Sequence, residues 1–354
     1  MTKDGQMTYS EAVKSGFRLI NSKWQLVAVQ AGMMLFNCIS FFILVGIPLG
    51  IAFIIFGLDL TGLAELKDIL GLVKSPAELL SKYFGLVLIV LISFLLYIIL
   101  ITTIGLYVFS GSIGTIGRSL LDPPSKFTLR SFSAEAKKLF FPLMWYSLVV
   151  GLVFLFIAFV FGLVGGGIAV AVSSAKSYDS TLALFLGIFF SLVLVLIGLS
   201  IILLALAATV YGTAALFFKG EGPLRSFRNA IKFLWNRPNA FWLYVILFSA
   251  YVATSFIVML IVYPFNLIPI IGPIISFPFQ ILSYVVQGYL GLVIIAAVFT
   301  YYFNGEIKKT EGPSSTEHLH DTTAESSTGG EDTSVPEAPG QETTPPERGE
   351  KGQN

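Results

Sequence analysis

The sequence predicts an all-α fold, a polytopic integral membrane helix bundle with six spans. Its 354 residues are 55% hydrophobic and only 12% charged, whereas a soluble domain carries about 25% charged residues. Five runs contain no Asp, Glu, Lys, Arg or His, and they cover residues 24–58, 83–117, 139–175, 180–218 and 238–305. A spanning helix needs about 20 apolar residues. The first four runs therefore hold one span each, and the fifth is long enough for two.

Basic residues between these runs predict the orientation of the chain. Alternate segments, 1–23, 117–138, 219–237 and 304–309, hold 16 Lys and Arg, whereas the opposite connections hold 4. Cytoplasmic segments of membrane proteins carry the excess of Lys and Arg. We therefore expect a multi-pass protein of the cell membrane (plasma or inner membrane) with both termini in the cytoplasm.

The composition changes at residue 310. Residues 310–354 have no aromatic side chain, and they carry ten acidic residues against Arg348 and Lys351. Such a segment cannot bury enough apolar surface to offset the entropy lost on folding. The sequence thus predicts a transmembrane domain over 1–309 and a disordered, acidic, cytoplasmic tail over 310–354.

A short pattern, A-x-K-x-x-aromatic, recurs at three equivalent places in this topology. It begins at Ala12, Ala136 and Ala230, and each copy precedes an outgoing span. Each unit is then a cytoplasmic amphipathic helix, a span out and a span back. Because every unit starts and ends on the same side, the units are expected to be parallel repeats about an axis along the membrane normal. Their approximate bounds are 8–117, 118–221 and 222–309.

The helices that carry this pattern are predicted to be amphipathic. Their apolar stripes follow helical spacing, and the two clearest consist of Val13, Phe17, Ile20 and Trp24, and of Leu224, Phe227, Ile231 and Leu234. An anionic bilayer surface attracts each nearby Lys or Arg by about 1 kcal/mol. The candidates for lipid-headgroup binding are Lys14, Arg18, Lys138, Arg225, Arg228 and Lys232. The competing interpretation is that these cations only fix orientation during insertion.

Each outgoing span meets a Gly- or Pro-rich break 22 residues after a tryptophan, at Gly46, Gly167 and Pro264. A helix of that length covers about 33 Å, close to one hydrocarbon thickness, so we expect helices to end there. The segment Pro264–Phe279 holds four prolines and no charge, and irregular backbone is not tolerated against lipid. We expect it to form a re-entrant hairpin or to lie flat in the interface. The connection 58–82 is expected to lie on the outer surface as a helix.

Uncharged polar side chains are scattered through the predicted spans and include Gln30, Asn37, Ser93, Thr102, Thr209 and Thr254. Gln280, Ser283 and Gln287 differ from these because they occupy i, i+3 and i+7 of the last span, one face of a helix. With Asn266, just before that span, they are candidates for a neutral pathway or binding site. The competing interpretation is packing between helices, where such groups contribute roughly 0.6–2 kcal/mol each.

Groups for catalysis or metal binding are not concentrated anywhere in the sequence. Both histidines, His318 and His320, lie in the tail, and the predicted spans contain no carboxylate. Catalysis requires titratable or nucleophilic groups placed together, and coupled transporters use intramembrane carboxylates. We therefore expect a protein that is not an enzyme and has no cofactor, no metal site and no nucleic-acid partner.

The patterned helix before the spans, the Pro-rich connection between the last two spans and the closing "VFTYYFNGE" carry a resemblance. Over about residues 8–306, the chain resembles a set of six-span prokaryotic membrane proteins. These are similar to the membrane domain attached to some bacterial glycerophosphodiester phosphodiesterases. The catalytic domain of those enzymes has no counterpart here, so the resemblance implies a membrane module of undefined role.

Two classes of function follow from these expectations. One is a non-catalytic membrane module for passive or partner-driven permeation, or for lipid handling, with the bilayer and especially its anionic lipids as partner. The other is a membrane scaffold that recruits an unknown protein partner through the cytoplasmic helices and the tail.

Overall fold

The computed structural model describes residues 7–61, 83–123, 126–266 and 271–307, and this part of the chain is helical, with no strand. The chain divides into two units, of which only the first, Met1–Thr310, contains described residues. The predicted tail and most of the segment predicted to lie on the outer surface fall outside the described residues. Both therefore stay predictions.

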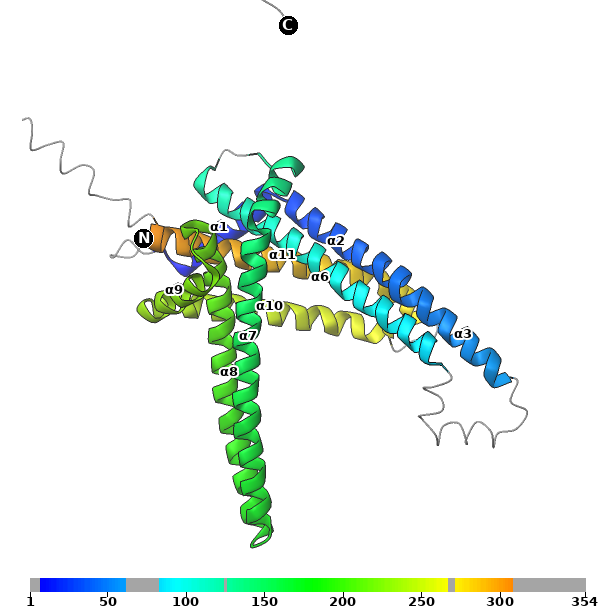
Figure 1. The fold of residues 1–354 in the computed structure, drawn as a ribbon. Coiled ribbons are helices and arrows are strands. Elements are labelled where there is room, and N and C mark those ends of the chain that lie inside the picture. The colour runs from blue at the N-terminus through cyan, green and yellow to red at the C-terminus, as the bar shows by residue number, and fades with distance from the viewer. Residues whose placement is uncertain (1–6, 62–82, 124–125, 267–270, 308–354) are drawn as a thin grey trace, which may run out of the picture. The chain divides into compact units, whose positions relative to one another are not determined.

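Figure 1 shows the helices in chain order, and from α6 to α9 each begins within about seven residues of the end of the one before. Their bounds are α1 Tyr9–Ser22, α2 Gln25–Phe41, α3 Ile47–Thr61, α6 Phe84–Leu121, α7 Leu129–Lys176, α8 Ser180–Lys219, α9 Pro223–Asn236, α10 Pro238–Asn266 and α11 Ile271–Tyr302. Two π-helical turns, Phe42–Gly46 and Phe303–Ile307, join α2 to α3 and extend α11. The helix predicted before the third span is continuous with that span in α7.

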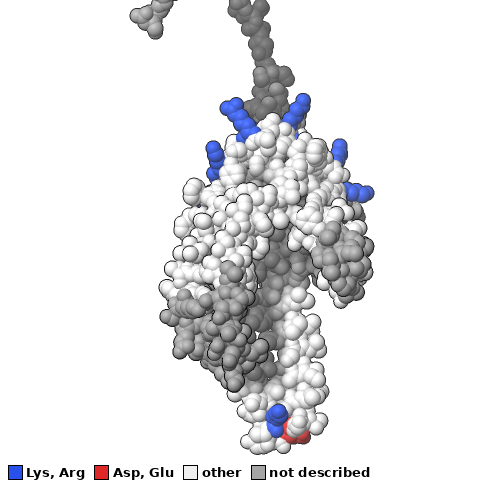
Figure 2. Space-filling view, turned by 90° about the vertical axis from the view of Figure 1, so that its right-hand side faces the viewer, with Lys and Arg blue, Asp and Glu red and all other residues white. Residues whose placement is uncertain are grey.

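Six helical segments in the described residues are long and apolar enough to cross a membrane. They are Gln25–Ile55, Phe84–Leu121, Leu129–Lys176, Ser180–Lys219, Pro238–Pro264 and Phe277–Ile307. Figure 2 shows basic side chains gathered near one end of these helices and a largely uncharged surface along them. Over the described residues the predicted helical fold is thus confirmed, and six helices of this length and composition indicate a multi-pass membrane protein.

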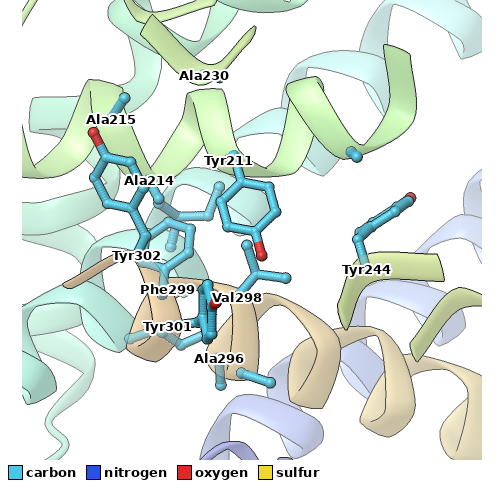
Figure 3. Packing of buried hydrophobic residues seen from close by; sticks show 14 of the residues in the cluster. Tyr211, Ala214, Ala215, Ala230, Tyr244, Ala296, Val298, Phe299, Tyr301 and Tyr302 are labelled. Carbon is cyan, nitrogen blue, oxygen red and sulfur yellow. The ribbon is translucent and has the colours of Figure 1, made fainter. Parts of the chain in front are cut away.

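The buried core lies where α1 and α9 meet the ends of α6, α8 and α11 and the first turns of α7 and α10. Its largest fully buried side chains include Tyr146, Tyr211, Phe299 and Tyr302. Figure 3 shows the last three beside one another, with alanines filling the space between helices. The Tyr211 hydroxyl donates a hydrogen bond to the Ala240 carbonyl at 3.0 Å. Aromatic packing of this kind fixes α8 against α10 and α11.

α1 lies along α11 in the antiparallel direction. Near one end of the contact, Asn304 donates a hydrogen bond to the Met7 sulfur at 3.4 Å. At the other end, the Tyr289 hydroxyl donates to Asn21 at 2.8 Å. Gly16, between these points, faces the α11 backbone directly. Small residues let helix backbones approach closely, which explains why α1 is held on α11.

The other two patterned segments pack in a comparable way, the start of α7 on α6 and α9 on α8. The alanine of the pattern is fully buried in all three copies, at Ala12, Ala136 and Ala230. The lysine two residues later is exposed in all three, at Lys14, Lys138 and Lys232. Each segment thus turns a small residue toward its neighbour and a cation away from it.

The residues of the predicted apolar stripes of α1 and α9 divide between the core and the outer surface. Phe17, Trp24 and Leu224 belong to those stripes and are 36%, 64% and 71% exposed. Ile20 and Leu234 also belong to them and are buried, beside Ala12 and Gly16 on α1 and beside Ser226, Ala230 and Phe233 on α9. The small residues of these buried faces permit close helix contact. The exposed stripe residues lie beside the basic side chains, so the use of the stripes at the headgroup boundary stays a prediction.

Two of the three predicted helix ends are also wrong. α7 continues through Gly167 to Lys176, and the first span continues past Gly46 into α3. The π-helical turn that ends at Gly46 is followed by Pro48, whose ring cannot fit against the carbonyl four residues earlier in a regular α-helix. A wider turn absorbs this mismatch within a continuous helix.

The described part of Pro264–Phe279 is helical and continuous with the two spans, which differs from the predicted re-entrant or interfacial segment, and residues 267–270 lie outside the described residues. α10 ends at Asn266, two residues beyond Pro264, as expected for the outgoing span. α11 then begins at Ile271 and continues through Pro278 into the last span. A helix satisfies its own backbone polar groups inside a bilayer, so the uncharged segment does not require irregular structure.

Candidate functional site

A cavity of about 580 Å³ lies between α10 and α11. Three of the four candidate residues from the sequence line it, namely Gln280, Ser283 and Gln287. The rest of its lining consists of Val252, Ser255, Phe256, Met259, Val262, Tyr263 and Tyr284. The fourth candidate, Asn266, is the last residue of α10, and its side chain lies outside what the structure describes.

Polar atoms of this cavity come from both helices. On α11, the Gln287 amide nitrogen donates to the Ser283 hydroxyl at 3.2 Å. On α10, the Ser255 hydroxyl is buried and has no hydrogen-bond partner among the described residues. Leaving a buried hydroxyl unbonded costs about 1–3 kcal/mol. A polar group that entered the cavity and bonded to Ser255 would therefore be stabilised.

The cavity opens sideways from the helix pair. Phe256, Met259 and Tyr284, which form part of its wall, are 59%, 64% and 58% exposed. In a bilayer, exposed apolar side chains at this depth face acyl chains. The cavity therefore has a polar lining and an opening toward the acyl chains.

A second cavity of about 450 Å³ adjoins the first and shares Tyr284 and Gln287 with it. It adds Gln30 and Asn37 from α2 to the lining. The Asn37 side-chain oxygen accepts a hydrogen bond from the Tyr97 hydroxyl at 2.7 Å, which ties α2 to α6. We call the two cavities together the polar groove, with polar lining residues Gln30, Asn37, Ser255, Gln280, Ser283 and Gln287.

The polar groove lies at membrane depth. Gln287 and Gln280 are 15 and 22 residues from Tyr302, where α11 ends, which places them about 22 and 33 Å along the helix. The hydrocarbon core of a bilayer is about 30 Å thick. On this measure Gln287 lies within the hydrocarbon core, and Gln280 lies near its far boundary, so the groove extends from the interior of the membrane toward one surface.

The six candidate headgroup-binding cations are all exposed. On α9 they are accompanied by Leu224 and Trp235, which are 71% and 83% exposed. Lys138 lines a further cavity of about 600 Å³, together with Trp145, where the start of α7 meets the turn between α8 and α9. Exposed tryptophan beside Lys and Arg is typical of the headgroup zone.

Several groove residues were not singled out from the sequence. The sequence predicts a packing role for Gln30 and Asn37, and no pattern marks Ser255 or Tyr284 as a site residue. Their only signal was a polar group within a charge-free run. That α2 lies against α11 depends on a contact between residues more than 240 positions apart, which no local pattern encodes.

Within the described ranges, no group of three or more His, Cys, Asp or Glu side chains lies together. Comparison of the chain with known proteins found no matching family model, no matching curated protein and no matching solved structure. The resemblance to the membrane domain of glycerophosphodiester phosphodiesterases therefore stays a prediction.

Proposed function

We propose that the protein is a non-catalytic integral membrane module that handles lipid. The polar groove accepts the uncharged polar part of a lipid, its glycerol and ester groups, while the acyl chains stay in the bilayer. One observation carries this proposal: Gln280, Ser283 and Gln287 line a single cavity that lies at membrane depth and opens sideways.

The chemistry of the groove suits this ligand. Each glutamine offers two N–H donors and one carbonyl acceptor, and each serine offers one donor, which match ester carbonyls and glycerol hydroxyls. Hydrogen bonds between side chains in membranes average about 0.6 kcal/mol. Four such bonds give about 2.4 kcal/mol, or roughly a fiftyfold preference. Binding of that strength is reversible, as passage of a lipid requires.

The basic surface supports contact with anionic lipid. α1, α9 and the start of α7 each expose at least one cation beside a large apolar side chain. The apolar group can enter the headgroup boundary, and the cation can approach phosphate. We propose that this surface faces the cytoplasmic leaflet, with both termini on that side of the cell membrane.

A threefold arrangement of units is part of the same proposal. The helix before each outgoing span packs on the return helix of another unit: α7 on α6, α9 on α8, and α1 on α11. The three return helices α6, α8 and α11 also contact one another. This cyclic order and the equivalent burial of Ala12, Ala136 and Ala230 support three parallel repeats about an axis along the membrane normal.

A scaffold that recruits a protein partner is the second proposal. It rests on the exposed basic helices and on the acidic tail, which lies outside the described residues. The two proposals differ in what they require of the polar groove, because a scaffold does not need Gln280, Ser283 or Gln287 to be polar.

The proposal is tested by lipid exchange between leaflets. Purified protein is reconstituted into vesicles that contain a headgroup-labelled fluorescent phosphatidylcholine, and a membrane-impermeant reagent quenches the outer leaflet. We expect exchange faster than in protein-free vesicles. Replacing the three polar residues of α11 should slow it by about twentyfold, because three hydrogen bonds of about 0.6 kcal/mol each, or roughly 1.8 kcal/mol, are lost. The combined variant is Gln280→Leu, Ser283→Ala and Gln287→Leu.

A matched control uses hydroxyls that bond to the backbone of their own helix and lie outside the groove. The control variant is Thr103→Val, Ser200→Ala and Thr254→Val, and it should exchange lipid as the wild type does. Exchange at the protein-free rate with wild-type protein would contradict lipid handling. Faster entry of glycerol in the absence of lipid exchange would favour permeation instead.

A further inference from the structure

The cavity of about 600 Å³ that contains Lys138 lies where the end of α6 and the start of α7 meet the turn between α8 and α9. Two charged side chains of opposite sign line it, Lys138 on α7 and Glu221 in the turn. Pockets for small ligands are typically about 300–1,000 Å³, so the cavity has room for the headgroup of a lipid. We propose that it binds a phospholipid whose headgroup carries both a phosphate and a primary ammonium group, as phosphatidylethanolamine does.

This cavity lies across the boundary between charged and apolar sequence. Lys138 directly precedes one charge-free run, and Glu221 follows another within three residues. The apolar wall comes from inside those runs and includes Phe141 and Trp145, which are 64% and 56% exposed. Charged groups next to exposed aromatic side chains are typical of the headgroup zone. A lipid can therefore place its headgroup between the two charges and its acyl chains along the wall.

The Lys138 ammonium group is available to a ligand. Lys138 is exposed, and within the described ranges its side chain has no hydrogen-bond or ion-pair partner. An ammonium group has three N–H donors on a flexible stem, and phosphate oxygens are good acceptors for them. Lys138 is therefore the group that we assign to the phosphate.

Glu221 is held in position by the turn between α8 and α9. The turn begins at Gly220, whose φ of 62° is a left-handed conformation that glycine adopts without strain. The Glu221 carbonyl accepts a hydrogen bond from the Ser226 hydroxyl at 3.3 Å, and one oxygen of its carboxylate accepts from the Asn229 side-chain amide. A carboxylate has about four lone-pair sites, so this fixed group can accept further N–H donors from a ligand ammonium.

Pro142, which lies inside α7, leaves a second acceptor near the same cavity. Because proline has no N–H, the carbonyl four residues earlier in the helix, that of Lys138, loses its α-helical partner. Both residues line the cavity. A primary ammonium group has three N–H donors. The ligand can therefore donate to the Glu221 carboxylate and to this backbone carbonyl.

The charges of this cavity fit a zwitterionic headgroup better than an anionic one. The charges of Lys138 and Glu221 cancel, and the other described residues of the lining are uncharged. A phosphate next to Lys138 and an ammonium next to Glu221 give each charge a partner of opposite sign. An anionic headgroup brings no partner for the Glu221 carboxylate, and a like charge beside it is unfavourable. The ring of Trp145 can also attract an ammonium group.

The inference rests on the proposed function in one respect, because both place this end of the helices in the headgroup zone. They differ in the lipid that they favour. A basic surface attracts anionic lipid in general, whereas this cavity selects a headgroup that also carries an ammonium group. No described residue lines both this cavity and the polar groove. Lipid exchange through the groove can therefore fail while binding here persists, and the reverse.

The test measures the melting temperature of the full-length protein in a neutral detergent, because a ligand that binds the folded state raises it. One arm adds phosphatidylethanolamine, and a second adds phosphatidylglycerol with the same acyl chains, which has the phosphate but no ammonium group. A third arm adds soluble phosphoethanolamine. We expect the largest shift with phosphatidylethanolamine and none with phosphoethanolamine, which has no chains for the apolar wall. Equal shifts with the two lipids, or a shift with phosphoethanolamine alone, would overturn the proposal.

Variants assign the two halves of the headgroup. Glu221→Gln should lower the preference for phosphatidylethanolamine over phosphatidylglycerol at least about tenfold, the factor expected for a hydrogen bond to a charged group. Its amide oxygen can still accept from Asn229, so the turn is kept. Lys138→Gln should weaken the binding of both lipids. The matched control is Lys137→Gln with Asp179→Asn, because Lys137 is exposed and asparagine caps α8 as well as Asp179 does. An unchanged preference in Glu221→Gln, or an equal loss in the control, would contradict the assignment.

Discussion

Replacing Gly16 by alanine should weaken the contact that holds α1 on α11. A Cβ atom at this position would lie 2.9 Å from the Val293 carbonyl oxygen and 3.0 Å from the Cβ of Ala297. Both neighbours are rigid, since one is backbone and the other is the first side-chain atom. Relief requires the two helices to separate, and overpacking of this kind costs about 1–3 kcal/mol.

A second effect acts in the opposite direction. Alanine is favoured over glycine inside a helix by about 0.5–1 kcal/mol. The net expectation for Gly16→Ala is therefore a loss of about 1–2 kcal/mol, which lowers the folding equilibrium constant by roughly 5–30-fold. The matched control is Gly32→Ala in α2, where nothing lies within 4 Å of the added Cβ. That variant should keep or slightly raise stability.

The assay is equilibrium unfolding of the purified protein in mixed micelles, followed by circular dichroism and by Trp fluorescence. Gly16→Ala should shift the midpoint to lower denaturant, and Gly32→Ala should not. Equal midpoints for the two variants would refute the close packing of α1 on α11, and with it the cyclic order of the three units.

Three further outcomes are expected. Removing the cations of α9 should weaken binding to anionic vesicles by about 1 kcal/mol per charge at low salt and leave binding to neutral vesicles unchanged in flotation assays; equal loss on both would assign the effect to folding. The variant is Arg225→Gln, Arg228→Gln and Lys232→Gln. In a Cys38→Ala background, cysteines in place of Arg130 and Tyr178 should be labelled from opposite sides of intact cells. Labelling of both from outside would contradict the predicted topology. The backbone N–H of Thr8 donates to Glu11 at 2.9 Å and lowers the pKa of that carboxyl. Its stabilisation is present above the unfolded pKa of about 4.3 and is lost as pH falls through the lower folded value. Hydrogen-exchange protection in the first turn of α1 should therefore fall with acid, and Glu11→Gln should abolish this dependence.

The spans were predictable because lipid imposes a simple constraint on sequence. A charge-free run of sufficient length has few alternatives to a transmembrane helix, and all six runs of helix follow from that rule. The face shared by Gln280, Ser283 and Gln287 was predictable for the same kind of reason, since helical periodicity alone places them together. Run length and helical periodicity were sufficient for these features, because each depends only on residues close together in the sequence.

The buried face of α1, the helices that contain prolines and half of the polar groove depend on contacts between residues far apart in the sequence. The stripe predicted for α1 included the buried Ile20, but it missed Ala12 and Gly16, the small residues that complete the buried face of the helix. Pro264 and Pro278 suggested a broken segment, yet both are accommodated within long helices. The second half of the polar groove depends on α2 lying against α11, which only the assembled fold provides.

The most direct measurement is photocrosslinking of the groove to lipid. Photoreactive benzoylphenylalanine is introduced in place of Tyr284, an aromatic side chain that lines both cavities of the polar groove. The control is the same replacement of Leu199 in α8, which is 53% exposed. These positions lie 18 and 20 residues before the ends of α11 and α8, or about 27 and 30 Å along their helices.

After irradiation in bilayers, mass spectrometry locates the new bond within the lipid. Bonds to the glycerol or headgroup region at position 284, with bonds to acyl chains alone at position 199, are the predicted result. Acyl-chain bonds alone at both positions would contradict lipid handling by the polar groove.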